Sequence, residues 1–408
     1  MQAKALGYPD LPIAVVPHPF GMLRRDQIHE VARKCAADIA ALLCKGTDAG
    51  VITGPAAAQS ALVAVSEDHD AINALFRERR WSDGLPVVPP TRERVSRMLW
   101  STARRPEEII AYLAPGFGAA TVERIAVNAV MAGCEPDYLP VLLAAVEAVA
   151  APEFNLQGIQ STTHSASVWL IVSGPVARAL GMNAGPNCLG QGNWANATLG
   201  RALRLILQNV GRAWPGEMDR ATAGQPGKYS FCCAENEAES PWEPLHVERG
   251  LSPEQSAVTV VGAEGTTNMN IHSKNADQML SVFADSMQRP AGNDFRTGGD
   301  PWVILSPEHA GVLQAAGLSK ADVKQRLWDR SKLRARRMTD LDLEHAQHAR
   351  RPELGEIFPD TMLPICTSPG KLGIIVAGGP GTHSVYVASF GNTCSVTREV
   401  MTGATLPA

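Results

Sequence analysis

The run Val168-Trp-Leu-Ile-Val172 decides the fold, because an unbroken apolar run rich in β-branched and aromatic residues is typical of a strand buried on both faces. Similar short apolar runs recur towards the C-terminus, and segments with helical periodicity separate them. The further predicted strands are 229–233, 258–261, 303–305, 373–376 and 385–387, and the predicted helices between them are 196–210, 276–287 and 320–333. This alternation predicts an α/β fold with a mixed, largely buried sheet and flanking helices.

The whole chain divides into three parts. Residues 1–48 form a small unit, residues 49–70 are rich in Gly, Ala, Ser and Thr and are expected to form a linker, and residues 71–408 form the large α/β domain. Early in the large domain, prolines exclude helix between Ser82 and Thr91, and Thr91 is placed to cap the next helix. Further helices are predicted at 72–81, 121–132 and 137–149.

The composition of the 408 residues narrows the class of protein. With 45% hydrophobic and 19% charged residues and a net charge of −4, the chain can bury a large core and has no stripe of Lys and Arg, so nucleic acid is not expected as a partner. The longest apolar stretch, 141–151, is too short for a bilayer, and no signal peptide is recognised, so we expect a cytoplasmic protein without membrane contact. A short basic run is predicted to be a solvated helix face: Arg330, Lys332, Arg334, Arg336 and Arg337.

The eight cysteines include no CxxC pair, which favours reduced thiols over a disulfide framework. Cys134 follows an apolar helix face and Cys366 lies in an apolar stretch, so both are expected to be structural and neutral.

The N-terminal unit contains the stretch Asp10-Leu-Pro-Ile-Ala-Val-Val-Pro-His18-Pro-Phe-Gly21, followed by a predicted helix at 26–43. One strand and one helix cannot cover both faces of the strand, so this unit is expected to be an incomplete α/β unit that packs on another domain or on a partner chain.

This stretch resembles the C-terminal portion of the UGSC-motif family, small α/β proteins named for a selenocysteine- or cysteine-Gly-Ser-Cys turn. In that family a strand ending in Val-Pro-His-Pro comes late in the domain, so the redox turn would precede residue 1, and the chain contains no Cys-Gly-Ser-Cys. The resemblance implies chemistry by an activated thiol or selenol. Either a separate subunit supplies this group, or the N-terminal unit is a remnant that has lost it. The resemblance also implies that His18 contacts the substrate. The large domain is similar to the uncharacterised segment that accompanies UGSC-type domains in longer bacterial proteins.

Four polar or Gly-rich loops are candidates for a ligand site at the strand ends. Loop 1, residues 158–165, combines several hydroxyls with His164. A functional site and an ordinary capped turn explain this composition equally well. Loop 2, residues 183–196, leads into a predicted helix, so its backbone N–H groups could hold a carboxylate or another small anion; a purely structural turn is the alternative.

The candidate anion contacts of loop 2 are Gly190, Gly192, Asn193 and Asn196. The loop matches a relaxed dinucleotide fingerprint, but no strand directly precedes it and no acidic residue follows at the required distance, so no nucleotide signature is present.

Loop 3 follows the predicted strand 229–233 and concentrates ionisable groups. In an extended segment Cys233, Glu235 and Glu237 share one face and Cys232 points the other way. Because neighbouring carboxylates raise a thiol pKa, they suit acid/base chemistry or a metal better than cysteine activation. The candidate catalytic residues of this loop are Cys232, Glu235, Glu237 and His246. The alternative is that the cysteines belong to the core and the glutamates are solvated.

Loop 4 is the glycine turn Val376-Ala-Gly378-Gly379-Pro-Gly381-Thr-His383-Ser384 between two predicted strands. So many glycines permit close approach of a ligand or of another backbone. The candidates here are His383 for catalysis and Gly378, Gly379, Gly381 and Ser384 for binding. Parallel alignment of the preceding strands would bring loops 3 and 4 to one pocket. His309, which lies outside these loops, is expected to be structural.

Three functions are compatible with these features. The first is an enzyme, or the large subunit of one, that binds a small polar substrate while a UGSC-type partner supplies a thiol or selenol for redox or cleavage chemistry. The second is a lyase or hydrolase in which Glu235, Glu237 and His246, with His164 or His383, hold a divalent metal that activates water. The third is a non-catalytic binding or scaffold subunit. A homo- or hetero-oligomer is expected in each case, and the cofactor is undetermined.

Overall fold

The computed structural model describes residues 13, 14, 16, 23–44 and 62–401. The chain separates into two units, residues 1–58 and 59–408. In the first unit the predicted helix is present as α2 (Arg25–Leu43), where the Arg24 N–H donates to Gln27 Oε1 at 2.9 Å. The strand expected within the stretch Asp10 to Gly21 lies mostly outside the described residues, and so does His18.

The second unit has the α/β fold that the alternation of apolar runs predicts. It is built on a curled, seven-stranded mixed sheet with the strand order β4-β3-β5-β10-β6-β9, and β11 also pairs with β5. The bounds are β3 (Ser167–Ser173), β4 (Cys232–Ala234), β5 (Ala257–Asn270), β6 (Trp302–Leu305), β9 (Gly373–Val376), β10 (His383–Ser389) and β11 (Val396–Glu399). β3 is parallel to β4 and β6 is parallel to β9, whereas β5 and β10 pair antiparallel with their neighbours.

Alternation along the strands divides the buried side chains among three cores. Trp169 on β3, Cys233 on β4 and Trp302 on β6 point into the curl of the sheet, and the Trp169 and Trp302 rings meet edge to face at 5.8 Å. The residues next to them along each strand point outwards into two helix-covered cores. Both faces of the sheet are therefore buried, as continuous apolar runs require.

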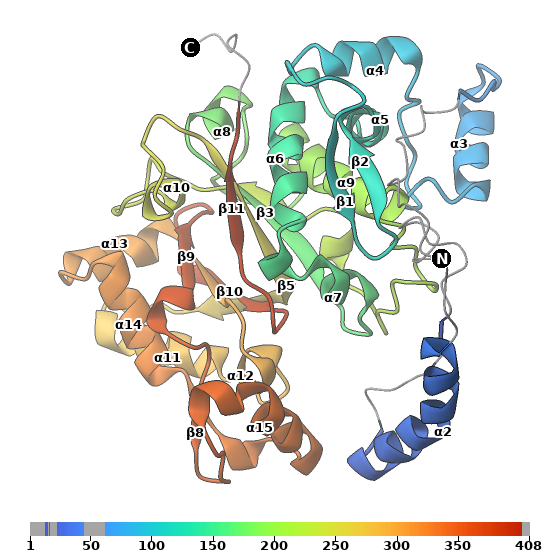
Figure 1. Cartoon of the computed structure of the whole chain (residues 1–408). Helices are drawn as coiled ribbons and strands as arrows, with labels where there is room; N and C mark the ends of the chain where they lie inside the picture. Colours follow the sequence, from blue (N-terminus) through green and yellow to red (C-terminus); the bar gives the residue numbers. More distant parts are fainter. Residues whose placement is uncertain (1–12, 15, 17–22, 45–61, 402–408) are drawn as a thin grey trace. The chain divides into compact units, whose positions relative to one another are not determined.

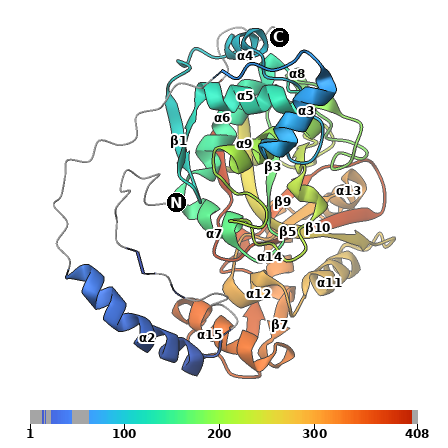
Figure 2. The ribbon, with the colours of Figure 1, turned by 90° about the vertical axis from the view of Figure 1, so that its right-hand side faces the viewer.

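Two groups of helices cover the outer faces (Figures 1 and 2). The first group packs around β3 and the first half of β5 and contains α5 (Val122–Ala132), α6 (Leu139–Val149) and α9 (Trp194–Asn209). The second group packs on β6, β9 and β10 and contains α11 (Ala276–Met287), α13 (Pro307–Ala315), α14 (Lys320–Arg330) and α15 (Asp340–Leu354). The remaining elements are α3 (His69–Glu78), α4 (Arg92–Leu99), β1 (Ile109–Leu113), β2 (Gly118–Thr121), α7 (Leu156–Ser161), α8 (Pro175–Ala179), α10 (Leu245–Glu248), α12 (Asn293–Thr297), β7 (Lys332–Arg334) and β8 (Met362–Pro364), with short 3-10 turns.

Several element bounds differ from the predicted ones for local reasons. The strand predicted at 229–233 begins only at Cys232, because Pro226–Lys228 forms a 3-10 turn. The strand predicted at 258–261 continues to Asn270. The polar sequence after residue 261 does not predict a strand, but pairing with β10 gives this part of the backbone its hydrogen-bond partners.

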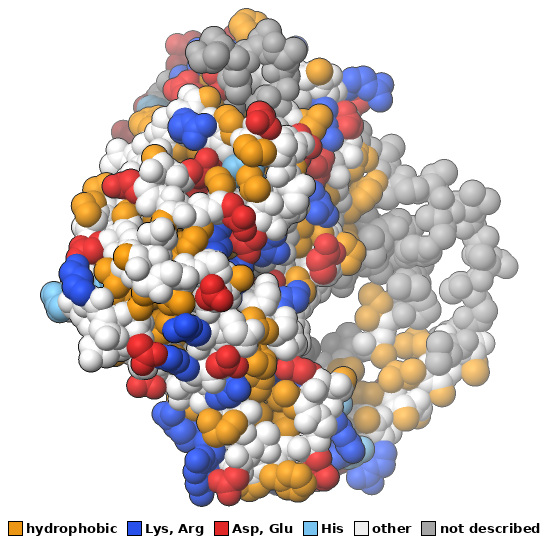
Figure 3. Space-filling view, turned by 90° about the vertical axis from the view of Figure 1, so that its left-hand side faces the viewer, with side chains coloured by type: hydrophobic (Ala, Val, Ile, Leu, Met, Phe, Trp, Pro, Cys, Tyr) orange, Lys and Arg blue, Asp and Glu red, His pale blue; other side chains and the backbone are white. Residues whose placement is uncertain are grey.

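The basic run was wrongly predicted to lie on a helix, since α14 ends at Arg330 and the run continues through β7 and a 3-10 turn. Several of its side chains have local partners: Arg336 pairs with Asp360 at 3.0 Å, and Lys332 Nζ lies 4.9 Å from the Trp328 ring centroid. Acidic and basic side chains are interspersed over the face of the molecule shown in Figure 3.

Within the described residues, no single helix has the length and apolar character needed to cross a membrane, although one sharply bent pair, 136–149 with 152–161, meets the length and composition criteria together.

Candidate functional site

Loops 3 and 4 meet at one end of the curled sheet. The Asn236 N–H donates to the Val376 carbonyl at 2.8 Å, and Asn236 Nδ2 lies 3.4 Å from the Gly378 carbonyl. The two segments are therefore adjacent, as expected, but the reason differs from the expected one. β4 and β9 stand at opposite ends of the strand order, and the curl of the sheet, not parallel pairing between neighbours, brings their ends together.

Loop 2 also contacts the place where loops 3 and 4 meet, and we call this meeting point of the three loops the loop junction. The Gly378 N–H donates to the Ala184 carbonyl at 2.8 Å, and the Ala234 N–H approaches the Asn183 carbonyl at 3.5 Å. A Cβ atom on Gly379 would lie 2.7 Å from Pro186 Cγ, so this position needs glycine for close packing of loops 2 and 4. Three of the four predicted loops thus form one structure.

The polar side chains of loop 2 hold the loop itself together. Asn193 accepts from the Asn196 N–H at 3.0 Å and caps α9. Asn196 is buried and donates to the carbonyls of Asn183 and Cys188 at 2.8 and 2.9 Å. Their hydrogen-bonding capacity is used internally, which favours the structural-turn interpretation of loop 2 over an open anion seat.

The glycines of loops 2 and 4 have similar structural reasons. Gly192 and Gly378 have φ values of +113° and +98°, which other residues rarely adopt. A Cβ atom on Gly190 would lie 2.2 Å from Asn187 Oδ1. The Gly381 carbonyl accepts a hydrogen bond from Ser306 Oγ at 2.7 Å and so fixes the turn to the start of α13.

Glu235 is the most unusual carboxyl group of this junction. It follows β4 directly and is 4% exposed, and one of its oxygens accepts from the Leu245 N–H at 2.7 Å. The other oxygen, Oε1, is buried without a hydrogen-bond partner among the described residues. Burial raises the pKa of Glu235 to about 7, because desolvation disfavours the charged form more than the nearby Lys320 favours it.

Glu237 and His246 lie beside Glu235. Glu237 accepts a hydrogen bond from the Gly174 N–H and lies 3.4 Å from an Arg178 nitrogen. His246 is 1% exposed, with its Nδ1 3.8 Å from Glu237 Oε1, and neither ring nitrogen has a hydrogen-bond partner within the described part of the chain. Glu237 is partly buried, and its charge helps to raise the pKa of Glu235. The three candidates Glu235, Glu237 and His246 therefore lie close to one another.

Two lysines of α14 add positive charge that the sequence interpretation missed. Lys320 Nζ lies 3.0 Å from Glu248 Oε2 and donates to the Glu243 carbonyl at 2.7 Å, and Lys324 also pairs with Glu248. Both side chains are nearly buried. No sequence signal links them to loop 3, because more than seventy residues separate the two segments and only the tertiary fold joins them.

The cysteines of this region divide into two kinds. Cys232 points away from the curl into the helix-covered core, and burial raises its pKa, which argues against the catalytic role assigned to it. Cys233 points inwards towards Cys188 of loop 2. The pKa of Cys188 is lowered by the hydrogen bond from the Cys233 thiol, with support from the backbone N–H groups of Cys188, Leu189 and Gly378. Cys188 was quoted within loop 2 but not recognised as a site residue, and only its glycine-rich surroundings could have suggested it.

Burial raises the pKa values of Cys134 and Cys366 to about 12. Cys134 Sγ donates to the Thr198 carbonyl at 3.4 Å, and Cys366 Sγ donates to the Ser368 carbonyl at 3.2 Å. These surroundings agree with the neutral, structural thiols that the sequence predicts.

The structure does not bring the remaining candidates to the junction. His164 precedes β3, whereas Glu235 follows the parallel strand β4, so about 20 Å of strand separates their positions. His164 instead lies 3.7 Å from Glu264. His383 is exposed and its Nδ1 lies 3.1 Å from Asn268 Oδ1.

Ser384 belongs to a separate, satisfied network. Its buried hydroxyl accepts from the Ser306 N–H at 3.2 Å and lies 2.7 Å from His309 Nδ1. His309 Nε2 donates to the Ile271 carbonyl at 2.9 Å, so Nδ1 of the neutral ring accepts from Ser384. Burial lowers the pKa of His309, which fits the structural role expected for it.

In the ranges that the structure describes, no group of three or more His, Cys, Asp or Glu side chains is arranged to hold a metal ion. The donor atoms of Glu235, Glu237 and His246 therefore lie together without forming a three-ligand metal site. What they can do is transfer protons, because a carboxyl group with a pKa near 7 exchanges protons readily at neutral pH and a buried imidazole can accept or donate one.

The fold and this junction define an α/β protein with a buried carboxylate–imidazole cluster. Comparison with known families adds a match to the model of the UGSC family over residues 1–45, so the N-terminal region is UGSC-like. No curated protein matches the chain.

Proposed function

We propose that the chain is an enzyme, or the large subunit of one, that acts on a small polar substrate by proton transfer at the junction of loops 2, 3 and 4. Glu235 would act as the general acid or base, and His246, held near Glu237, would carry the second proton position. The substrate class is small because the cluster is enclosed by loops that pack closely on one another.

One observation carries this proposal. Glu235 Oε1 and both ring nitrogens of His246 are buried without hydrogen-bond partners among the described residues, and such groups cost free energy unless something else makes use of them. Clusters of perturbed and unsatisfied titratable groups are enriched at functional sites.

Turnover of a defined mixture of small polar metabolites, followed by mass spectrometry, tests the proposal. The wild-type protein should consume at least one component, and Glu235→Gln and His246→Ala should each slow its consumption by about 100-fold, the contribution typical of one acid/base group. The matched control is Glu254→Gln, which neutralises an exposed glutamate outside the cluster.

Full turnover by Glu235→Gln would rule out the assigned role. If the wild-type protein consumes nothing but retains a component of the mixture, the non-catalytic binding function is favoured instead.

A second candidate adds thiol chemistry to the same site. Two features favour it, namely the UGSC-like match over residues 1–45 and the Cys188 thiol, whose hydrogen-bond donors lower its pKa beside the acid/base cluster. The chain itself contains no Cys-Gly-Ser-Cys. The thiol or selenol would therefore come either from a UGSC-type partner protein or from Cys188.

Addition of a purified Cys-Gly-Ser-Cys protein distinguishes the two sources. Turnover that rises on addition, and that is lost when the partner's cysteines are replaced by serine, supports the partner as the source. Turnover that needs no partner and disappears in Cys188→Ser assigns the thiol to this chain, and turnover indifferent to both changes excludes thiol chemistry.

A further inference from the structure

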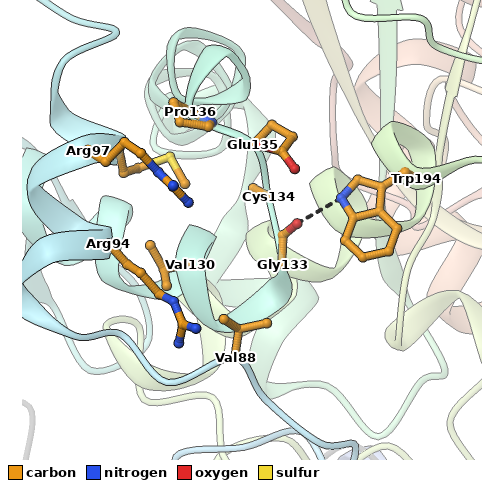
Figure 4. A pocket seen from close by; sticks show the side chains of 10 residues that line it. Val88, Arg94, Arg97, Val130, Gly133, Cys134, Glu135, Pro136 and Trp194 are labelled. Atoms are coloured by element: carbon orange, nitrogen blue, oxygen red, sulfur yellow. Dashed lines mark hydrogen bonds between the residues drawn. The ribbon is translucent and has the colours of Figure 1, made fainter.

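A second site, apart from the loop junction, lies between α4, the start of α9 and the segment 133–136. It is a pocket with a cavity volume of about 170 Å³. In Figure 4, Arg94 and Arg97 extend into it from one side, and Glu135 and Trp194 border the other side. A cavity of about 150 Å³ is sufficient to hold a benzene molecule, so this pocket has room for one six-membered ring with a small substituent.

The two arginines are the source of its charge. They lie three residues apart on α4 and therefore project from the same side of the helix. Arg94 donates to the Pro89 carbonyl at 3.0 Å but forms no ion pair with any described residue. The Arg97 guanidinium has neither a hydrogen bond nor an ion pair within that part of the chain. Two guanidinium groups that face one small space without an ion-pair partner among the described residues have the charge and geometry that suit a carboxylate or phosphate group.

The opposite wall is aromatic and fixed. Trp194 is 61% exposed, yet its Nε1 donates to the Gly133 carbonyl at 2.9 Å and so anchors the indole. A Cβ atom on Gly133 would lie 3.5 Å from Trp194 Cζ2, and Val88 closes the same side. A large aromatic ring kept at the surface by a hydrogen bond is a platform on which a flat ligand can stack.

We infer that this pocket binds a small aromatic anion, with its carboxylate or phosphate group at Arg94 and Arg97 and its ring against Trp194. Glu135 borders the same pocket and disfavours a second negative charge. The preferred ligand therefore carries one anionic group on one ring, and this binding is independent of the chemistry proposed at the loop junction.

Calorimetric titration of the full chain with four probes tests this inference. Benzoate and phenyl phosphate supply the ring with either anionic group, benzamide supplies the ring without charge, and inorganic phosphate supplies charge without the ring. We expect saturable binding of at least one of the two aromatic anions, and at least tenfold weaker binding of benzamide and inorganic phosphate. The two aromatic anions compared with each other identify the carboxylate or the phosphate as the group recognised.

Variants assign the binding to the pocket. The double variant Arg94→Gln/Arg97→Gln should weaken binding of the aromatic anion at least tenfold, and Trp194→Leu should weaken it several-fold. Glu135→Gln should strengthen binding, which a merely structural disturbance would not do. The matched control Arg92→Gln removes a charge from the same helix outside the pocket and should leave affinity unchanged.

Three results would overturn the inference. The first is no saturable binding of either aromatic anion at 10 mM, a concentration on the order of the weakest affinities of specific sites. The second is binding of benzamide as tight as that of the aromatic anions, and the third is unchanged affinity in the double arginine variant. Circular dichroism of each variant verifies that the fold is retained.

Discussion

Two buried carboxyl groups, Asp294 and Glu235, have pKa values that burial raises to about 7, yet their surroundings differ. Asp294 accepts hydrogen bonds from the hydroxyls of Tyr386 and Ser389 and from the Ser389 N–H at 3.3 Å, so both of its oxygens are used. Glu235 has one bonded oxygen and one without a partner among the described residues. Burial and a raised pKa are common to both groups, and only hydrogen-bond satisfaction separates them.

This difference assigns the two groups to different tasks. The Asp294 network ties α12 to β10 and is complete without any further molecule. The Glu235 cluster lies where three loops meet and, within the described part of the chain, leaves polar atoms without a hydrogen-bond partner. A buried carboxyl group with a raised pKa therefore indicates a functional site only when its hydrogen-bonding capacity is unfilled.

The largest effect should come from removing the satisfied group. Asp294→Ala leaves the Tyr386 and Ser389 hydroxyls buried without their acceptor, so we expect a loss of about 3 kcal/mol in the free energy of unfolding. Urea denaturation measures it, with the exposed Asp285→Ala as control. Glu235→Gln keeps the neutral form that burial favours and still offers an oxygen to the Leu245 N–H, so it should not lower this free energy at pH 7. Equal losses in Asp294→Ala and Glu235→Gln would remove the distinction between the two groups.

The pH dependence of stability sharpens the comparison further. Between pH 4.5 and about 7 the folded protein keeps the Glu235 proton that the unfolded chain releases. The free energy of unfolding therefore falls as pH rises through this window, by up to about 1.4 kcal/mol per pH unit for this group. Urea denaturation at pH 5, 6, 7 and 8 should show that the free energy of unfolding falls less steeply with pH in Glu235→Gln than in the wild-type protein. The part of the fall that comes from Asp294 should remain in this variant. An unchanged slope in this variant would mean that Glu235 titrates normally.

Cys366 tests the region around Asp294, because burial raises the pKa of this thiol and the Asp294 charge adds to the rise. Its side chain is fully buried, so Cys366→Ala should cost about 1–2 kcal/mol of stability while turnover at the loop junction is kept. The measurements are urea denaturation and the metabolite assay. Loss of turnover in a folded Cys366→Ala protein would show that the two regions are coupled.

The smallest effect is expected at His383. Its side chain is exposed, and among the described residues it bonds only Asn268 on the neighbouring strand, so His383→Ala should change the free energy of unfolding by less than about 0.5 kcal/mol. Thermal denaturation monitors this change. A larger loss would place His383 in the packed region that Ser384 occupies.

The fold could be predicted where a segment's own pattern determines its structure. The helix at 276–287 and the strand at 373–376 have the predicted bounds, because apolar periodicity and burial agree there. The second half of β5 and the helix α15 were missed, since their polar sequences are stabilised by partners distant in the chain.

The candidate site follows the same rule. Glu235, Glu237 and His246 come from one short segment and were predicted together, and the structure keeps them together. Lys320, Lys324 and Cys188 come from other segments, so only the curl of the sheet and the packing of α14 reveal them. His164 was included because it lies in a polar loop next to a predicted strand, and the direction of β3 places it at the opposite end of that strand from Glu235.

The long strand β5 has a consequence for how the molecule unfolds. Its first half pairs with β3 and β11, its second half pairs with β10, and Ala263 contributes to both pairings. One continuous backbone segment thus belongs to both helix-covered halves, so neither half can lose its sheet without disrupting the strand that the other half needs. Residues 62–401 should therefore melt as one cooperative unit with a single heat-absorption peak, in spite of their three separate cores.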